Sequence, residues 1–320
     1  MHAIVAREAG GPEVLKLTEV ERPVPGPGQL LVKVAAVGVN FIDTYKRSGS
    51  YKVSYPFTPG SEASGTVEEI GDGVTGFSPG DRVASAEGVN CYAGYALIDE
   101  DKALPVPRGV DDFTAAALPL QGITAHYLIN STFKVEPGHT VLLHAGAGGV
   151  GLLLIQLLKA RGARVITTVS TGDKDRLARE AGADHVLRYD GFAAKVRELT
   201  NGTGADVVYD GVGKDTFDGS LDALRIRGTL VLFGAASGPV PPFDPQRLNA
   251  GGSLYLTRPT IAHFLRDARE RRWRSDELFA AVANGSLKVR VGARYDLAEA
   301  ARAHDDLEQR RTTGKVILVP

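Results

Sequence analysis

The stretch His144-Ala145-Gly146-Ala147-Gly148-Gly149-Val150-Gly151 decides the fold of the second half of the chain. Apolar residues 140–143 precede it and predict a buried strand, and the helix formers of 152–161 follow it. Gly146, Gly148 and Gly151 thus form a G-x-G-x-x-G pattern between a strand and a helix, a setting typical of dinucleotide binding. The helix N-terminus offers N–H groups and partial positive charge to a pyrophosphate. The alternative is a glycine-rich turn of an α/β domain that binds nothing.

The composition is that of a globular protein with no strong electrostatic preference for a partner. The 320 residues are 43% hydrophobic and 23% charged, with a net charge of −1 at pH 7. So small a charge gives no bulk attraction to nucleic acid or to a membrane surface. Cys91 is the only cysteine, which excludes an intrachain disulfide and a thiolate zinc cluster. Since no secretory or membrane-spanning apolar run is found, we expect a cytoplasmic protein.

The order of the predicted elements divides the chain into two domains. Residues 1–122 are rich in predicted strands. Within residues 123–260, the stretch from 137 to about 260 alternates strand-like runs with amphipathic stretches, which predicts βαβ units and a doubly wound parallel sheet. Residues 261–320 show two helical patterns and then strand, helix and strand. The fold class is therefore α/β, and periodicity leaves open whether the tail extends the sheet or returns to the first domain.

Three polar features allow more than one interpretation. Residues 40–47 predict one or two helical turns, and their pattern favours a solvated surface helix. Glu62 follows a proline-rich bend and is either a buried carboxylate with a role or an acceptor that stabilises a loop. A basic cluster in the tail is expected to be a solvated helix end, and comprises Arg269, Arg271, Arg272 and Arg274.

The end of the second predicted strand indicates which dinucleotide is bound. NAD-binding domains place an acidic residue there to accept the ribose 2′-hydroxyl. This strand ends at Ser170 without an acid, and Lys174 follows one helical turn later. A hydroxyl and an ammonium group suit a 2′-phosphate, so we predict NADPH. Asp173 opposes this prediction by charge, and Arg176 or Arg179 would offset it.

Six short motifs lie in the order typical of one enzyme family. They are Gly-Val-Asn-Phe-Ile-Asp-Thr-Tyr (38–45), Pro-Gly-Ser-Glu-Ala-Ser-Gly (59–65), Pro-Gly-Asp-Arg-Val (79–83), Ala-Gly-Ala-Gly-Gly-Val-Gly (145–151), Val-Val-Tyr-Asp-Gly-Val-Gly (207–213) and Gly-Ser-Leu-Tyr-Leu-Thr-Arg-Pro (252–259). Through them the chain resembles the zeta-crystallin-like quinone oxidoreductases of the medium-chain dehydrogenase/reductase superfamily. The resemblance covers nearly the whole chain, and the joint pattern is more specific than any single motif.

The resemblance implies a fold that periodicity does not give. Residues 1–122 and 261–320 would form a GroES-like, distorted β-barrel domain, and residues 123–260 a Rossmann domain inserted into it. NADPH would lie in the cleft between the two. The resemblance also implies a homodimer or homotetramer, often built by joining sheets across subunits. Zinc-dependent relatives have a cysteine where Asn40 stands and a histidine where Ser61 stands, so a site without metal is implied.

Site residues follow from the resemblance position by position. The substrate side near the nicotinamide would be lined by Asn40, Asp43, Tyr45 and Tyr51. The cofactor would be contacted by Thr124 near the nicotinamide, by Gly146, Gly148, Gly149, Val150 and Gly151 at the pyrophosphate, by Ser170, Lys174 and Tyr189 at the 2′-phosphate, and by Phe233, Ser237 and Arg258 along the groove. Ala235 would contribute its backbone.

The expected activity is zinc-independent hydride transfer from NADPH to a small-molecule quinone. Tyr45 or Tyr51 and the Asn40 amide are the candidates for donating a hydrogen bond to the oxygen that gains charge. One alternative is an NADPH-dependent enone or enoyl-thioester (alkenal) reductase with a tyrosine as proton donor. Another is an RNA-binding or structural, crystallin-like role, which the balanced charge does not favour.

Overall fold

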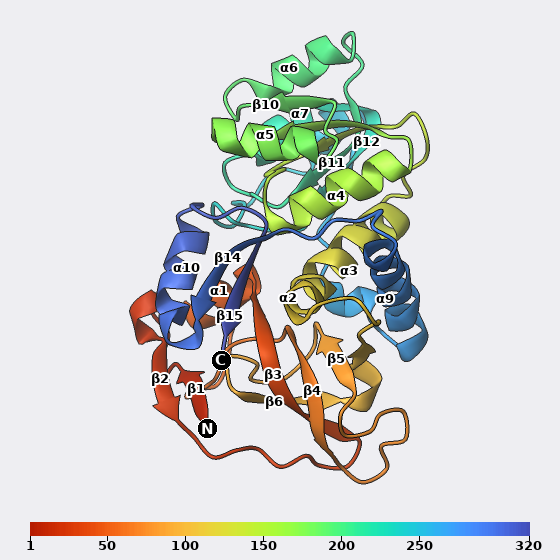
Figure 1. Ribbon diagram of the computed structural model, residues 1–320. Coiled ribbons are helices and arrows are strands. Elements are labelled where there is room, and N and C mark those ends of the chain that lie inside the picture. Colours follow the sequence, from red (N-terminus) through yellow and green to blue (C-terminus); the bar gives the residue numbers. More distant parts are fainter. The chain divides into compact units, whose positions relative to one another are not determined.

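The computed structural model describes residues 1–320 and divides them into two units, whose elements are labelled in Figure 1. Unit 1 comprises residues 1–123 and 266–320, and unit 2 comprises residues 124–265. The second junction lies later than the sequence indicates, because the 3-10 helix η4 (Ile261–Phe264) packs within unit 2. There the Phe264 ring stacks on Tyr127 with ring centroids 4.4 Å apart.

All strands of unit 2 run parallel, in the spatial order β10-β9-β8-β11-β12-β13. This is the strand order of doubly wound dinucleotide-binding sheets, so the predicted architecture is confirmed. Helices α4 and α5 pack together, as do α6 and α7, and Figure 1 shows α4 and α5 in front of the sheet. The strand order reverses between β8 and β11, where such folds place a ligand beyond the carboxyl ends of the strands.

The elements of unit 2 follow the predicted alternation of strand and helix. They are the end of α3 (Pro119–Tyr127), η3 (Leu128–Thr132), β8 (Thr140–Leu143), α4 (Gly149–Ala160), β9 (Arg164–Thr168), α5 (Gly172–Glu180), β10 (His185–Leu187), α6 (Phe192–Leu199), β11 (Ala205–Asp210), α7 (Phe217–Asp222), β12 (Leu224–Leu232), α8 (Gln246–Ala250), β13 (Tyr255–Thr257) and η4.

Unit 1 is organised around one long strand, β3 (Gln29–Val39), whose apolar sequence is buried along most of its length. Its sheet has the order β14-β15-β3-β4-β5-β7, and β6 also pairs with β3. Strand β15 pairs antiparallel with β3, so the C-terminal tail returns to the first domain, as the resemblance implies. Figure 1 shows this tail, in blue, beside the orange strand β3.

The remaining elements of unit 1 are mostly short, apart from the 16-residue helix α9. They are β1 (His2–Val5), η1 (Pro12–Val14), β2 (Lys16–Glu19), α1 (Phe41–Arg47), β4 (Ala63–Ile70), β5 (Arg82–Ser85), β6 (Tyr95–Asp99), η2 (Glu100–Lys102), β7 (Leu104–Pro105), α2 (Asp112–Ala117), α9 (Ala268–Ala283), β14 (Val291–Asp296), η5 (Leu297–Glu299), α10 (Ala300–Glu308) and β15 (Lys315–Val319).

The core of unit 1 combines both ends of the chain. Val37 of β3 and the Tyr92 ring pack in one apolar cluster with Ala303 of α10 and Leu318 of β15. Burying these side chains stabilises the unit at about 25 cal/mol per Å² of apolar surface. The tail is therefore part of the first domain's core.

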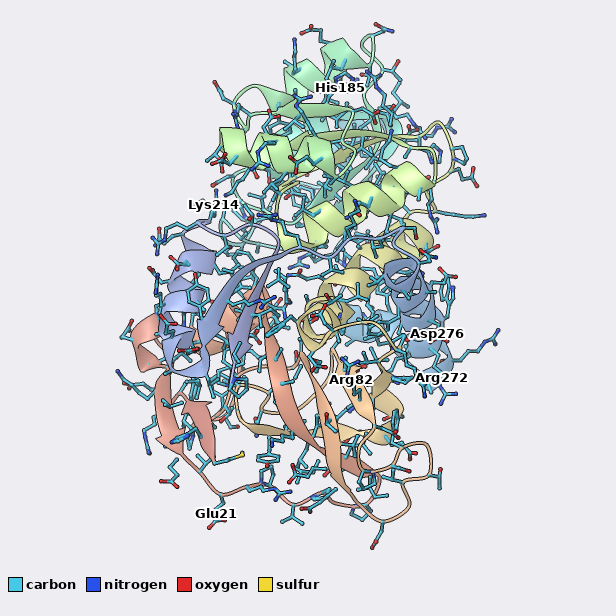
Figure 2. All side chains as sticks on the ribbon, viewed as in Figure 1. Glu21, Arg82, His185, Lys214, Arg272 and Asp276 are labelled. Atoms are coloured by element: carbon cyan, nitrogen blue, oxygen red, sulfur yellow. The ribbon has the colours of Figure 1, made fainter.

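The basic cluster of the tail is not the solvated helix end expected from the sequence. The two helical patterns predicted there are, beyond η4, a single helix, α9. The side chains of Arg271 and Arg274 are buried and pair with Glu87 at 2.6 Å and Glu270 at 2.6 Å, respectively. Arg272, labelled in Figure 2, projects outward as expected. The expectation fails because Arg271 and Arg274, three residues apart, share the buried face of the helix, whereas Arg272 lies about 100° away from Arg271.

Candidate nucleotide and acceptor sites

The glycine-rich turn joins β8 to α4 with the close contacts that its sequence predicts. Gly146 donates its backbone N–H to the Thr168 carbonyl at 3.1 Å. A Cβ added at Gly146 would lie 2.2 Å from Thr167 Oγ1, and one at Gly151 would lie 2.4 Å from the Ala145 oxygen. Neither position has room for a side chain. The glycines therefore allow the tight turn and let the start of α4 pack closely against it.

The first turn of α4 supplies the electrostatics of an anion site. Gly148 is the N-cap, and the Leu152 N–H donates to its carbonyl at 2.9 Å as the first bond of the helix ladder. The N–H groups of 149–151 precede that bond and have no intrahelical acceptor. They point out of the helix start, where the helix dipole favours negative charge.

A buried histidine holds the strand ends behind this turn, and sequence reasoning assigned it no role. His144 Nε2 lies 2.9 Å from Ser220 Oγ, and Nδ1 lies 2.8 Å from Thr168 Oγ1. Ser220 donates to Asp210 Oδ2 at 2.8 Å, so we assign the imidazole proton to Nε2. Burial lowers the pKa of His144 to about 4 despite the opposing effect of Asp210. The neutral ring thus fixes β8, β9, β11 and α7 together.

The residues predicted for the 2′-phosphate gather beyond the end of β9. Lys174 Nζ donates to Ser170 Oγ at 3.3 Å, and both side chains lie at the surface. The Tyr189 ring stacks on His144 with centroids 6.1 Å apart and an interplanar angle of 20°. The hydroxyl, the ammonium group and an aromatic wall therefore lie on neighbouring segments of unit 2.

The arginines that were expected to offset Asp173 are engaged elsewhere on α5. Arg176 pairs with Glu180 at 2.9 Å, and Arg179 pairs with Asp175 at 2.5 Å. Lys174 is thus the cation that the structure brings to Ser170.

The remaining predicted cofactor residues lie on three other segments: α3, the loop after β12 and the end of β13. Thr124 is buried on α3, and Arg258 is exposed directly after β13. Phe233 follows β12, and its N–H donates to the carbonyl of Asp210 at 2.8 Å. The Ser237 hydroxyl donates to the Val212 carbonyl at 2.8 Å, so it holds the loop after β12 against the loop after β11.

Helix α1 forms where residues 40–47 predict it, but it is not the solvated surface helix that the pattern favours. Asn40, Asp43, Thr44 and Arg47 are all buried. Asp43 Oδ2 accepts the Asn40 backbone N–H at 2.9 Å, and its Oδ1 is buried without a hydrogen bond. Burial raises the pKa of Asp43 to about 6. This carboxyl group supports the helix from inside, and its place on the substrate side stays a prediction.

The Asn40 amide is likewise committed to the interior. Its Nδ2 donates to Glu62 Oε2 at 2.7 Å and to the Gly38 carbonyl at 3.2 Å, and its Oδ1 accepts from Lys315 Nζ at 2.7 Å. Both amide hydrogens are thus used, and Asn40 has none left for an acceptor oxygen. The role of this amide as a donor to the acceptor stays a prediction, and it would require one of these two bonds to break.

Glu62 and Lys315 form a buried ion pair beside that amide. The two side chains are 0% and 1% exposed, and Lys315 Nζ donates to Glu62 Oε2. The other Glu62 oxygen accepts the Leu120 N–H at 2.7 Å. Burial lowers the pKa of Lys315, whereas Glu62 acts in the opposite direction. Of the two interpretations of Glu62, the structure favours the buried acceptor that holds segments together.

The tyrosines predicted for the substrate side remain accessible. Tyr51 is 45% exposed, and Tyr45 is partly exposed on α1. Their ring centroids are 5.5 Å apart, and the Phe41 ring lies 6.2 Å from Tyr45. The Tyr51 N–H donates to the Tyr45 carbonyl at 3.0 Å, which ties the loop after α1 to the helix. These two phenols are the candidate donors that the structure leaves in place.

Comparison with known proteins identifies the family. The family model "Alcohol dehydrogenase GroES-like domain" matches residues 26–135, and "Zinc-binding dehydrogenase" matches residues 149–279. The chain is 45% identical over 315 residues to a quinone oxidoreductase of Pseudomonas aeruginosa, covering 97% of each chain. The chain belongs to the quinone oxidoreductases of the medium-chain dehydrogenase/reductase superfamily. The two-domain fold expected from the resemblance, GroES-like and Rossmann, is thereby confirmed.

Other relatives cover the chain as fully. A mycobacterial protein whose structure was solved in complex with NADPH is 55% identical, has a TM-score of 0.98 and is covered completely, as is this chain. A 2-haloacrylate reductase of a Burkholderia species is 41% identical over 331 residues, covering 99% of this chain and 98% of its own.

Two further findings concern this member of the quinone oxidoreductases. No group of three or more His, Cys, Asp or Glu side chains is placed to hold a metal ion. No helix is both long enough and apolar enough to cross a membrane.

Proposed function

We propose that this chain reduces quinones with a hydride from NADPH and needs no metal ion to do so. The observation that carries the proposal is the β8–α4 turn, a strand–glycine turn–helix unit that leaves the N–H groups of 149–151 at the start of α4 without intrahelical acceptors. The names and the cofactor complex of the full-length relatives support the same activity.

The residues of unit 2 fit NADPH. The N–H groups at the start of α4 suit a pyrophosphate, and Ser170 with Lys174 suits a 2′-phosphate. A carboxylate at the end of β9, the mark of NAD binding, is replaced by the Ser170 hydroxyl. When bound, the nicotinamide ring supplies a hydride, the equivalent of two electrons and one proton.

The acceptor needs little from the protein beyond orientation and a hydrogen bond. Adding a hydride to a quinone leaves negative charge on one oxygen, and one further proton completes the hydroquinone. A phenol hydrogen aimed at that oxygen lowers the barrier. We assign this role to Tyr45 or Tyr51, since the Asn40 amide is committed elsewhere.

The experiment follows NADPH oxidation by para-benzoquinone after the protein has been dialysed against a chelator. We expect turnover to survive chelation and kcat/KM to favour NADPH over NADH by at least about tenfold, as binding of one charged group predicts. Loss of turnover that zinc restores would refute the metal-free part, and a preference for NADH would refute the cofactor assignment.

A second candidate is reduction of activated carbon–carbon double bonds, which the 2-haloacrylate reductase relative favours. In that reaction the hydride adds to the β-carbon, and a proton must be delivered to the α-carbon. Removing the phenol should therefore lower kcat/KM more for an activated alkene than for a quinone, because the quinone oxygen can take its proton from water. Comparing kcat/KM of Tyr45→Phe for para-benzoquinone and for 2-chloroacrylate separates the two activities.

We also propose that two copies associate through the free edge of the unit 2 sheet. Strand β13 ends the sheet, and Ile226 on β12 and Tyr255 on β13 are 70% and 61% exposed. An exposed apolar edge strand is suited to pairing with a second sheet. We expect a dimer by light scattering and a monomer after Tyr255→Lys, and a wild-type monomer would end this proposal.

The expected compartment is the cytoplasm, since the one cysteine is free and buried.

A further inference from the structure

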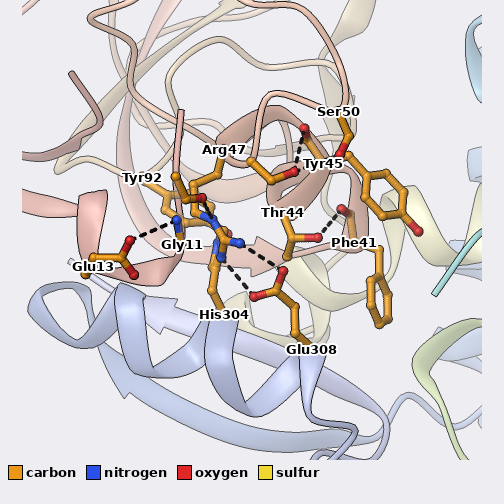
Figure 3. A network of polar contacts seen from close by, with 12 residues as sticks. Gly11, Glu13, Phe41, Thr44, Tyr45, Arg47, Ser50, Tyr92, His304 and Glu308 are labelled. Carbon is orange, nitrogen blue, oxygen red and sulfur yellow. Dashed lines mark hydrogen bonds and ion pairs between the residues drawn. The ribbon is translucent and has the colours of Figure 1, made fainter. Parts of the chain in front are cut away.

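Helix α1 is connected to helix α10 by a buried chain of polar side chains that the proposed activity does not explain (Figure 3). Tyr92 Oη lies 3.3 Å from Asp43 Oδ2 and 2.9 Å from His304 Nε2. His304 Nδ1 lies 3.4 Å from an Arg47 guanidinium nitrogen. Arg47 forms two hydrogen bonds of 2.9 Å with the Glu308 carboxylate. The chain thus begins on α1 at Asp43, passes through Tyr92 and His304 of α10, returns to α1 at Arg47 and ends on α10 at Glu308.

The hydrogens in this chain can be arranged in one way. The Arg47 guanidinium only donates, so His304 Nδ1 must accept and Nε2 must carry the proton. Tyr92 then accepts from His304 and donates its own hydrogen to Asp43. Burial and the charge of Arg47 lower the pKa of His304 to about 3, so its ring stays neutral. Every link of the chain therefore has a fixed direction.

The geometry of α1 turns this chain into a device that sets the helix rotation. Asp43 and Arg47 are four residues apart and lie on one face of the helix, about one turn from each other. Tyr45 is two residues from each, which places it about 200° around the helix, on the opposite face. A helix of seven residues does not hold its own orientation without tertiary contacts. Two fixed points on the inner face therefore fix where Tyr45 points.

We propose that Glu308 and His304 of α10, acting through Arg47 and Tyr92, are positioning residues that aim the Tyr45 phenol at the acceptor. The inference rests on the proposed function, because it supplies the reason for the direction of Tyr45. It assigns helix α10 a part in acceptor reduction although none of its residues is among those predicted for the acceptor site.

The first test is independent of turnover. Protein labelled with 3-fluorotyrosine gives a fluorine resonance for Tyr45, identified by its loss in Tyr45→Phe. We expect Glu308→Gln to shift or broaden that resonance, because Arg47 loses its bidentate partner. Glu308 is 31% exposed, so the variant should fold. Glu198→Gln removes an exposed ion pair with Lys195 of unit 2 and serves as the matched control. An unchanged Tyr45 resonance in Glu308→Gln overturns the proposal whatever the enzyme reduces.

The second test is a double-mutant cycle in turnover. Tyr92→Phe keeps the ring and removes the central hydroxyl, and we expect it to lower kcat/KM for the acceptor about tenfold, since misplacing a reacting group is costly. The Kd for NADPH should stay within about twofold, because the effect is confined to acceptor reduction. In a Tyr45→Phe background the same change should cost nothing further.

The two tests separate the failure of this proposal from the failure of the proposed function. Additive losses in the cycle, or a weaker NADPH Kd in Tyr92→Phe, would mean that Tyr92 acts only through general stability and would overturn the positioning role. If no quinone is reduced by the wild type, the proposed function fails, and the fluorine resonance still decides whether α10 sets the direction of Tyr45.

Discussion

The glycine-rich turn of unit 2 and helix α1 of unit 1 are built in opposite ways. The turn is specified by eight consecutive residues, and most of what it offers a ligand is backbone. Helix α1 is held by side chains from distant segments, among them Glu62, Tyr92, His304 and Lys315. Substitutions far from the turn should therefore leave its backbone site intact. Helix α1, in contrast, depends on residues up to 275 positions away in the sequence. The difference predicts which substitutions should impair stability or cofactor binding in each unit.

The largest effect is expected from breaking the buried pair of unit 1. Lys315→Met leaves the Glu62 carboxylate buried without its cation, which should cost about 3–5 kcal/mol of unfolding free energy. Chemical denaturation measures the loss, and Lys33→Met, at an exposed position of β3, is the control. A cost equal to that of the control would show that α1 does not depend on this distant anchor.

A local change in the turn of unit 2 should be nearly as damaging to NADPH binding. In Gly146→Ala the new Cβ would lie 2.2 Å from Thr167 Oγ1, which forces the turn to move. A displacement of this kind should raise the Kd for NADPH roughly 10²-fold. Gly172→Ala, where no atom lies within 4 Å of the added Cβ, should leave the Kd unchanged in a fluorescence titration. Equal affinities in the two variants would contradict the assigned site.

Each unit contains a buried histidine whose pKa is lowered, so both units should lose stability in acid. Burial depresses the pKa of His304 to about 3 and that of His144 to about 4, below the value near 6.5 of an unfolded chain. As the pH falls below 6.5, each of these histidines binds a proton in the unfolded state but stays neutral in the folded state. Each histidine should therefore lower the free energy of unfolding by on the order of 2 kcal/mol at about pH 5, and this loss should be absent above pH 7.

The pH effect is isolated by comparing unfolding free energies of the wild type and His304→Gln at both pH values. The difference cancels other groups, including Asp43, whose raised pKa acts in the opposite sense. The wild type should lose about 2 kcal/mol more than the variant. Parallel pH profiles would show that His304 is not held neutral.

The smallest effect is expected at the surface of unit 2. Lys174→Ala removes the ammonium group beside Ser170 and should raise KM for NADPH about tenfold, as loss of one exposed phosphate contact predicts. KM for NADH, which has no 2′-phosphate, should stay the same. Arg176→Ala changes a neighbouring cation that is paired with Glu180 and should leave both constants unaltered. Parallel changes with both cofactors would remove Lys174 from the phosphate site.

The sequence predicts elements that are encoded within a few neighbouring residues, but it does not predict contacts between segments that are distant along the chain. The glycine turn and the strand β10 lie where the pattern places them, because hydrophobic period and glycine spacing are read within a few residues. Strand β12 begins five residues before its predicted start, because Arg227 and Gly228 resemble a turn, and Arg227 does have a positive φ of 58°. Even so, the strand continues through this irregularity.

The inner face of α1 illustrates the limit. Asp43 and Arg47 are polar, so their pattern favours a solvated helix, and only the folded chain brings His304 and Glu308 to them. The same holds for Arg271, whose partner Glu87 is 184 positions away. His144 differs from these residues. A polar residue that ends a buried strand can be recognised in the sequence, although no role was predicted for it.

The most direct test of the proposed activity is calorimetric titration of the chelator-treated protein with NADPH and with NADH. We predict binding of one NADPH per chain, at least about tenfold tighter than NADH because of the 2′-phosphate contacts. Absence of NADPH binding, or equal affinity for the two cofactors, would contradict the account.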